Sequence, residues 1–102
     1  MNMIDNVLQE ELSRLIDLKR HYEKKSKLLP KGSVYVKRNS GNPYVYLAYR
    51  EGGRIKQRYL GREGNPKAAE ICQRVMKRKE SDGHIRSISK DIIRLRKMLH
   101  VR

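Results

Sequence analysis

Apolar side chains recur every three or four residues near the start of the chain, where neither glycine nor proline occurs before Pro30. This spacing aligns them along one face of a helix. Pro30 ends the segment, because proline lacks the backbone N–H and its ring clashes with the preceding turn. The pattern predicts a helix over residues 1–29 with an apolar stripe formed by Ile4, Leu8, Leu12, Leu15 and Tyr22.

The end of the chain carries a second stripe, with spacings of three, four, three and four residues, over the expected helix 82–102. The stripe comprises Ile85, Ile88, Ile92, Leu95 and Leu99. A heptad pattern of this kind buries one narrow face against a partner helix. We expect it to pair within the chain, antiparallel, with Leu8, Leu12 and Leu15 of the first helix. Coiled-coil pairing of the same stripes between two copies, as a homodimer, is the alternative.

Between the helices, residues 31–62 consist of short β-rich runs separated by turn residues. The sequence predicts strands at residues 34–38, 44–50 and 54–60. The turn cluster Asn39–Pro43 and the tight turn at Gly52–Gly53 separate them. Loops this short join neighbouring strands in an antiparallel meander.

Asn65 and Pro66 then start another helix, as an N-cap followed by a first-turn proline. We expect this helix to span residues 65–80 and Ser81–Gly83 to separate it from the last helix. The fold class is therefore α+β, with a three-stranded antiparallel sheet, a packed helix, and long N- and C-terminal helices that pair. With 102 residues, a single domain over 1–102 is expected.

The net charge narrows the choice of partner. The chain has 25 Lys and Arg residues against 11 Asp and Glu residues, a net charge of +14. Such an excess repels itself in a compact state and favours a polyanionic partner, of which nucleic acid has the highest charge density. Residues 31–62 contain eight basic residues and only one acidic residue, Glu51. Half of the excess charge therefore falls on the predicted sheet.

Strand alternation assigns side chains to the two faces of that sheet. One face is expected to be buried under the helices, and it comprises Val34, Val36, Val45, Leu47, Ile55 and Tyr59. The other face is expected to bind nucleic acid, and it comprises Tyr35, Lys37, Tyr44, Tyr46, Arg50, Arg54, Lys56 and Arg58. Cations neutralise phosphates, and the planar Tyr and Arg groups can contact bases. Tyrosine also favours strands without any ligand, so a purely structural sheet cover is the competing interpretation.

The sequence gives little indication of metal binding or catalysis. His21, His84 and His100 lack metal-ligand spacing, and Cys72 occupies the apolar side of its helix. No serine has a His–Asp arrangement that would activate it, and no carboxylate pair suggests acid–base catalysis. The sequence therefore predicts no enzyme, no metal and no cofactor. It contains neither a signal-peptide pattern nor an apolar run that could span a membrane, so a cytoplasmic location is expected.

The middle of the chain resembles known proteins. The runs Lys31–Tyr35, Tyr44–Gly53 and Lys56–Gly61 resemble a family of small uncharacterised proteins of prokaryotes and their mobile elements. Over residues 31–80 the layout is also similar to the three-stranded, arm-type DNA-binding domain of phage tyrosine recombinases. That resemblance implies a sheet that enters the DNA major groove. The long flanking helices and the absence of a recombinase catalytic domain depart from it, which leaves binding alone.

Two functions follow from these patterns. The first is a non-enzymatic nucleic-acid-binding protein, with DNA favoured over RNA. The second is a mobile-element regulator of the anti-CRISPR type, which would bind a nuclease or a nucleoprotein complex. Binding that depends on salt tests the first function. A stoichiometric protein partner that persists in nuclease-treated lysate would favour the second.

Overall fold

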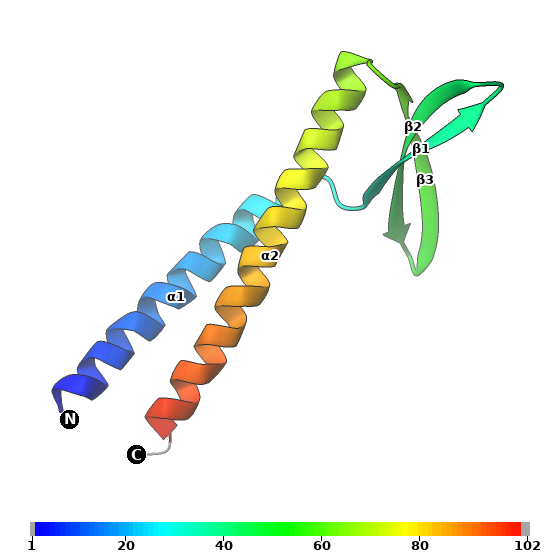
Figure 1. The fold of residues 1–102 in the computed structure, drawn as a ribbon. Helices are drawn as coiled ribbons and strands as arrows, with labels where there is room; N and C mark the ends of the chain where they lie inside the picture. The colour runs from blue at the N-terminus through cyan, green and yellow to red at the C-terminus, as the bar shows by residue number, and fades with distance from the viewer. Residues whose placement is uncertain (1, 101–102) are drawn as a thin grey trace. The chain divides into compact units, whose positions relative to one another are not determined.

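The computed structural model describes residues 2–100 and contains two helices and three strands (Figure 1). In chain order these are α1 (Met3–Lys27), β1 (Ser33–Asn39), β2 (Asn42–Glu51), β3 (Arg54–Arg62) and α2 (Pro66–His100). Residues 1, 101 and 102, which the expected end helices included, lie outside the described residues. The predicted α+β class is confirmed.

The internal contacts group into two compact units, where the chain length led us to expect one domain. A helical unit combines the residues up to Leu28 with those from Glu80 onward, and a sheet unit spans Leu29–Lys79. The first half of α2 thus belongs to the sheet unit, and its second half belongs to the helical unit.

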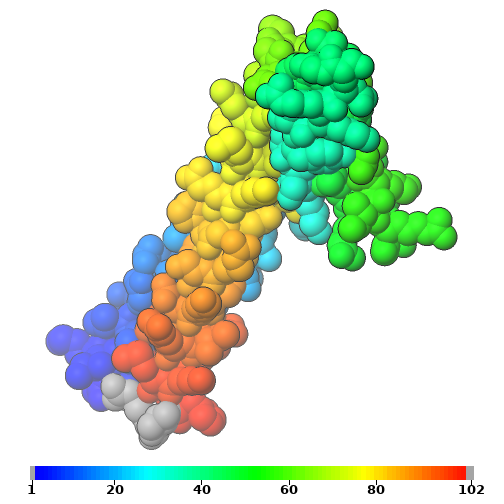
Figure 2. All heavy atoms as spheres, turned by 45° about the vertical axis from the view of Figure 1, so that its right-hand side comes forward, coloured from blue at the N-terminus to red at the C-terminus, as the bar shows by residue number. Residues whose placement is uncertain are grey.

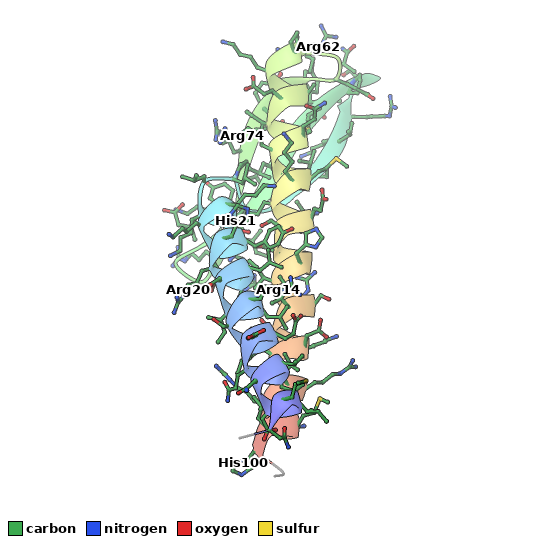
Figure 3. The ribbon with its side chains drawn as sticks, turned by 90° about the vertical axis from the view of Figure 1, so that its left-hand side faces the viewer. Arg14, Arg20, His21, Arg62, Arg74 and His100 are labelled. Carbon is green, nitrogen blue, oxygen red and sulfur yellow. The ribbon has the colours of Figure 1, made fainter. Side chains whose placement is uncertain are left out.

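In the helical unit, α1 and the second half of α2 lie side by side and run in opposite directions (Figures 1 and 3). Their core is formed by Leu15, Ile88 and Ile92, each at most 7% exposed. Further apolar side chains pack against this core, namely Leu12, Ile16, Leu18, Tyr22 and Leu95. The predicted pairing of the two stripes within one chain is therefore confirmed, because the core draws on both of them. Ile4, which was expected in the first stripe, is 60% exposed and does not contribute to this core.

The ion pairs of α1 lie at the surface and add little to this packing. Arg14 donates two hydrogen bonds to Glu11, at 2.6 and 2.9 Å, and these bonds hold the pKa of Glu11 below its usual value. Arg20 Nη1 lies 3.8 Å from Asp17 Oδ1, and both side chains are exposed. Exposed pairs of this kind contribute little, since water screens them. Apolar burial therefore holds the two helices together.

The expected break at Ser81–Gly83 is wrong, since α2 is a single helix from Pro66 to His100. Ser81 is buried, and its hydroxyl accepts a hydrogen bond from Ser26 Oγ at 2.8 Å and donates one to the Tyr22 carbonyl at 3.1 Å. A serine breaks a helix mainly when its hydroxyl competes for its own backbone. Here the hydroxyl forms its hydrogen bonds with α1. Gly83 lowers the stability of the helix by only about 1 kcal/mol relative to alanine.

The sheet unit contains the predicted meander, with strand order β1–β2–β3 and antiparallel pairing throughout. Each connection is a two-residue turn, Ser40–Gly41 or Gly52–Gly53, and all four residues have positive φ. This is the backbone of a type I′ turn, whose twist matches that of the strands it joins. The predicted turn cluster Asn39–Pro43 shortens accordingly, because Asn39, Asn42 and Pro43 belong to the strands.

The first half of α2 belongs to this unit and begins at Pro66, with Asn65 as the predicted N-cap. The Asn65 side chain accepts a hydrogen bond from the Lys67 N–H at 2.9 Å, which satisfies a donor of the first turn. Ala68 and Val75 are its buried positions, and Val45, Leu47 and Gly61 are those of the sheet. Arg78 donates to the Leu29 carbonyl at 2.9 Å, so this part of α2 also holds the segment that leads into β1.

Within residues 2–100, neither helix is both long enough and apolar enough to cross a membrane.

A Gly83→Ala substitution tests the continuity of α2. The added methyl would lie 3.8 Å from its nearest neighbour, an ordinary contact. We expect the free energy of unfolding to rise by about 0.5–1 kcal/mol, since alanine is the better helix former. Urea unfolding followed by circular dichroism measures it. Gly32→Ala is the contrast, since Gly32 has φ +136° and its added methyl would collide with the Ala48 carbonyl. A loss of stability in Gly83→Ala would contradict a continuous helix.

The core of the helical unit can be tested with two isoleucines of α2. Ile88 is 7% exposed, whereas Ile93 is 53% exposed. Ile88→Ala should lower the free energy of unfolding by about 2–5 kcal/mol, because it removes buried methyl groups and leaves a cavity. Ile93→Ala, the same chemical change, should cost less than about 1 kcal/mol. Equal losses in urea unfolding would refute the assignment of the buried face.

Candidate nucleic-acid interface

The Gly52–Gly53 turn determines which residues of β2 and β3 share a face. A two-residue loop pairs Glu51 with Arg54, and the pairing continues through Tyr49 with Lys56 to Tyr46 with Tyr59. Paired residues project from the same side of a sheet. Ile55 and Tyr59 therefore share the face of Arg50 and Tyr46.

The predicted face assignment of β3 is thus wrong. Arg54, Lys56 and Arg58 do not lie with the tyrosines, because Lys56 pairs with Tyr49 and Arg58 pairs with Leu47. They lie on the face that carries Val34, Val45 and Leu47, which we call the aliphatic face. A one-residue shift of register moves every side chain of a strand to the other face.

The expected buried set is correspondingly reduced. Val45 and Leu47 are buried as predicted, and Val34 is partly buried. Ile55 is 66% exposed and Tyr59 is 53% exposed, because both project from the opposite face. Val36 shares the face of Val45 but is exposed, and it belongs to an edge strand.

A β-bulge then changes the alternation near the end of β3. The pairing shifts between Val45 and Tyr46, so that Tyr44 pairs with Arg62. Without the extra residue, Arg62 would project from the aliphatic face. Its guanidinium instead lies 5.9 Å from the centre of the Tyr44 ring and donates to Asn42 Oδ1 at 3.0 Å. The bulge thus adds a cation to the tyrosine-bearing face (Arg62 is labelled in Figure 3).

The face of the sheet opposite the aliphatic face carries four of the tyrosines, and we call it the tyrosine face. Its polar and aromatic members are Ser33, Tyr35, Lys37, Asn39, Asn42, Tyr44, Tyr46, Arg50, Gln57, Tyr59 and Arg62. Tyr35, Tyr46 and Tyr59 form a row across the three strands, with ring centres 5.6 and 5.5 Å apart. In the next row, Tyr44 has Lys37 on one side and Arg62 on the other.

The tyrosine face contains a shallow open hollow of about 430 Å³. Its lining comprises Asn39, Ser40, Asn42, Tyr44, Tyr46 and Tyr59. Three aromatic rings thus form one side of the hollow, and amide and hydroxyl groups from the β1–β2 turn form the other.

Every charged side chain of the tyrosine face is basic. Lys37, Arg50 and Arg62 are its charged residues, and none of the side chains that the described strands place on it is acidic. Glu51 projects from the aliphatic face, where its Oε1 lies 3.7 Å from Lys56 Nζ. Figure 2 shows the tip of the β2–β3 hairpin, in green, extending away from the rest of the sheet unit.

The predicted site is therefore brought together only in part. Tyr35, Lys37, Tyr44, Tyr46 and Arg50 share the tyrosine face as expected. This face also carries four residues that the sequence pattern did not indicate, namely Tyr59, Arg62, Asn39 and Asn42. The two-residue turn at Gly52–Gly53 was the signal that would have placed Tyr59, since it pairs odd-numbered with even-numbered residues. The bulge that turns Arg62 has no comparable signal.

The residues considered for other chemistry do not assemble into a site. Among residues 2–100, no group of three or more His, Cys, Asp and Glu side chains is placed to hold a metal ion. Cys72 is partly buried and forms no disulfide. The His84 ring stacks on Tyr22, with ring centres 4.8 Å apart, in the helical unit.

Residues 4–70 match the model of a protein family described as a domain of unknown function, DUF6788. The chain belongs to this family. The DUF6788 match includes α1 from Ile4 onward, all three strands and the first turn of α2, so the whole tyrosine face lies inside it. No curated protein and no solved structure matches the chain.

One feature of the tyrosine face in this DUF6788 chain predicts a stability change. The Tyr35 hydroxyl is buried and makes no hydrogen bond with the described residues. An unsatisfied buried hydroxyl costs about 1–3 kcal/mol. Tyr35→Phe should therefore raise the free energy of unfolding by about 1 kcal/mol, measured by urea unfolding. Tyr59→Phe, at an exposed ring, should leave it within about 0.5 kcal/mol. Destabilisation by Tyr35→Phe would indicate that the hydroxyl has a partner.

Proposed function

We propose that this protein is a non-enzymatic nucleic-acid-binding protein and that its tyrosine face contacts the nucleic acid. The observation that carries the proposal is the composition of this face: four tyrosines, three cations and two asparagines, with no acidic side chain. A purely structural sheet surface has no need to keep carboxylates away. A surface that approaches phosphates does, because each carboxylate would repel them.

The two kinds of side chain support different parts of the interaction. Lys37, Arg50 and Arg62 can neutralise phosphates and release condensed counterions, which provides affinity that depends on salt. The exposed ring of Tyr59 and its neighbours can contact bases or sugars. Together they cover the backbone and the bases of one bound strand.

The cations on the aliphatic face have a different part in this proposal. Arg54, Lys56 and Arg58 project from the opposite side of β3, yet they are exposed and add to the positive potential of the sheet unit. Long-range attraction of this kind raises the rate of association. We propose that they attract the polyanion and that the tyrosine face makes the contacts.

The preference for DNA over RNA and the cytoplasmic location stay predictions from the sequence, and the homodimer stays an alternative. The same holds for the alternative function, a mobile-element regulator that binds a nuclease or a nucleoprotein complex. Pull-down from nuclease-treated lysate discriminates that alternative, because a stoichiometric protein partner would persist there.

Two double variants with equal loss of charge test the proposed contact surface. Lys37→Ala with Arg62→Ala removes two cations from the tyrosine face, and Arg54→Ala with Arg58→Ala removes two from the aliphatic face. Binding to labelled DNA and RNA is measured by fluorescence anisotropy over a salt series. The first variant should flatten the slope of log affinity against log salt by about 1.4–1.8, since each phosphate contact contributes about 0.7–0.9.

The second double variant should change this slope by less than half as much, because its arginines attract without contacting phosphate. Circular dichroism verifies that both variants fold. Equal effects would place the contacts on both faces. Affinity that does not depend on salt in the unmodified protein would refute the proposed electrostatic binding.

A further inference from the structure

We infer that the hollow of the tyrosine face accepts an unpaired nucleobase, so that the protein binds single-stranded rather than duplex nucleic acid. This inference rests on the proposed function and specifies its ligand. The hollow combines aromatic rings, amide groups and flanking cations within one surface of the sheet unit.

The rings leave a stacking surface open. Tyr59 contacts Tyr46 and Tyr44, with angles of 56° and 58° between the ring planes. Because both contacts are tilted, neither neighbouring ring lies flat on Tyr59, and its side chain remains 53% exposed. Tyr35 and Tyr46, by contrast, are nearly parallel at 17° and stack on each other. The stacked pair of Tyr35 and Tyr46 supports the floor of the hollow, and the Tyr59 ring is left open for stacking.

The amides at the rim can hydrogen-bond to the edge of a base. Asn39 and Asn42 pair with each other across the β1–β2 turn, and both line the hollow. Asn42 Oδ1 accepts from Arg62, which orients the amide so that its NH₂ group remains as a donor. Amide side chains form complementary hydrogen bonds with base edges. The hollow thus offers stacking from one side and hydrogen bonds from the other.

An unpaired base suits this arrangement better than a duplex does. In a duplex the faces of the bases are covered by their neighbours, and only base edges are accessible in the grooves. An aromatic surface can stack only on a base that is unpaired or turned out of the helix. Lys37 and Arg62 flank Tyr44 in one row, where they can reach the phosphates on either side of the stacked nucleotide. The sheet that enters a duplex major groove, which the recombinase resemblance implies, is the competing outcome.

The test compares three labelled probes of one mixed sequence of about 12 nucleotides, within the usual range of site sizes. The probes are single-stranded DNA, single-stranded RNA and the DNA duplex, and binding is measured by anisotropy at low salt. The unmodified protein should bind one or both single strands more tightly than the duplex. Tyr59→Leu should weaken that binding about five- to hundredfold, since it removes a stacking ring. Its effect on duplex binding should stay below about twofold.

Two further variants keep the test independent of folding defects. Tyr59→Phe retains the ring and should bind within about twofold of the unmodified protein. Tyr59→Trp introduces the first tryptophan of a chain that has none. Its emission should be quenched on addition of the single strand and unchanged with the duplex.

The outcomes separate the inference from the proposed function. If the duplex binds as tightly as both single strands, or if Tyr59→Leu weakens all probes equally, the inference is overturned and the proposed function stands. If no probe binds at low salt, the proposed function itself fails. Single-strand preference with a selective loss in Tyr59→Leu and quenching in Tyr59→Trp supports both.

Discussion

The register of the sheet is the constraint on which the candidate site depends. Two-residue turns at Ser40–Gly41 and Gly52–Gly53 leave only one pairing for each hairpin. This pairing aligns Tyr35, Tyr46 and Tyr59 in one row across the strands. The bulge beyond Tyr59 then turns Arg62 to the same side. Bulges commonly re-aim a side chain next to a functional site, and here the result is a cation beside an aromatic hollow.

The same register distributes the cations over the two faces of the sheet. The aliphatic face carries Arg54, Lys56 and Arg58, whereas the tyrosine face carries Lys37, Arg50 and Arg62. The net charge of +14 therefore does not describe one uniform patch. Under the proposed function, the rings of the tyrosine face would contact individual bases, and the cations of the aliphatic face would strengthen attraction over longer distances. In the helical unit the stabilising contacts are mainly apolar, with buried serines where α1 and α2 approach closely.

Much of the fold could be predicted, because helix and strand patterns are local. The spacing of Leu8, Leu12 and Leu15 identified the paired face of α1, and Asn65–Pro66 marked the start of α2. The break expected at Ser81–Gly83 does not occur, because Ser81 has hydrogen-bond partners in α1 that its neighbours in the sequence do not reveal. The Ser81 hydroxyl is satisfied by α1, a contact between residues 59 positions apart in the chain.

The sequence by itself determined α1, the three strands and their meander, the apolar stripes of the helices and the concentration of charge on residues 31–62. These depend on periodicity, turn residues and composition, all of which can be recognised in short segments. Only the tertiary structure decided which charges accompany the tyrosines. A strand's alternation defines two sets of residues, but the pairing with its neighbour selects the side on which each set projects. The bulge in β3 adds a second change of side within the same strand, so Arg62 joined the tyrosine face and Arg58 did not.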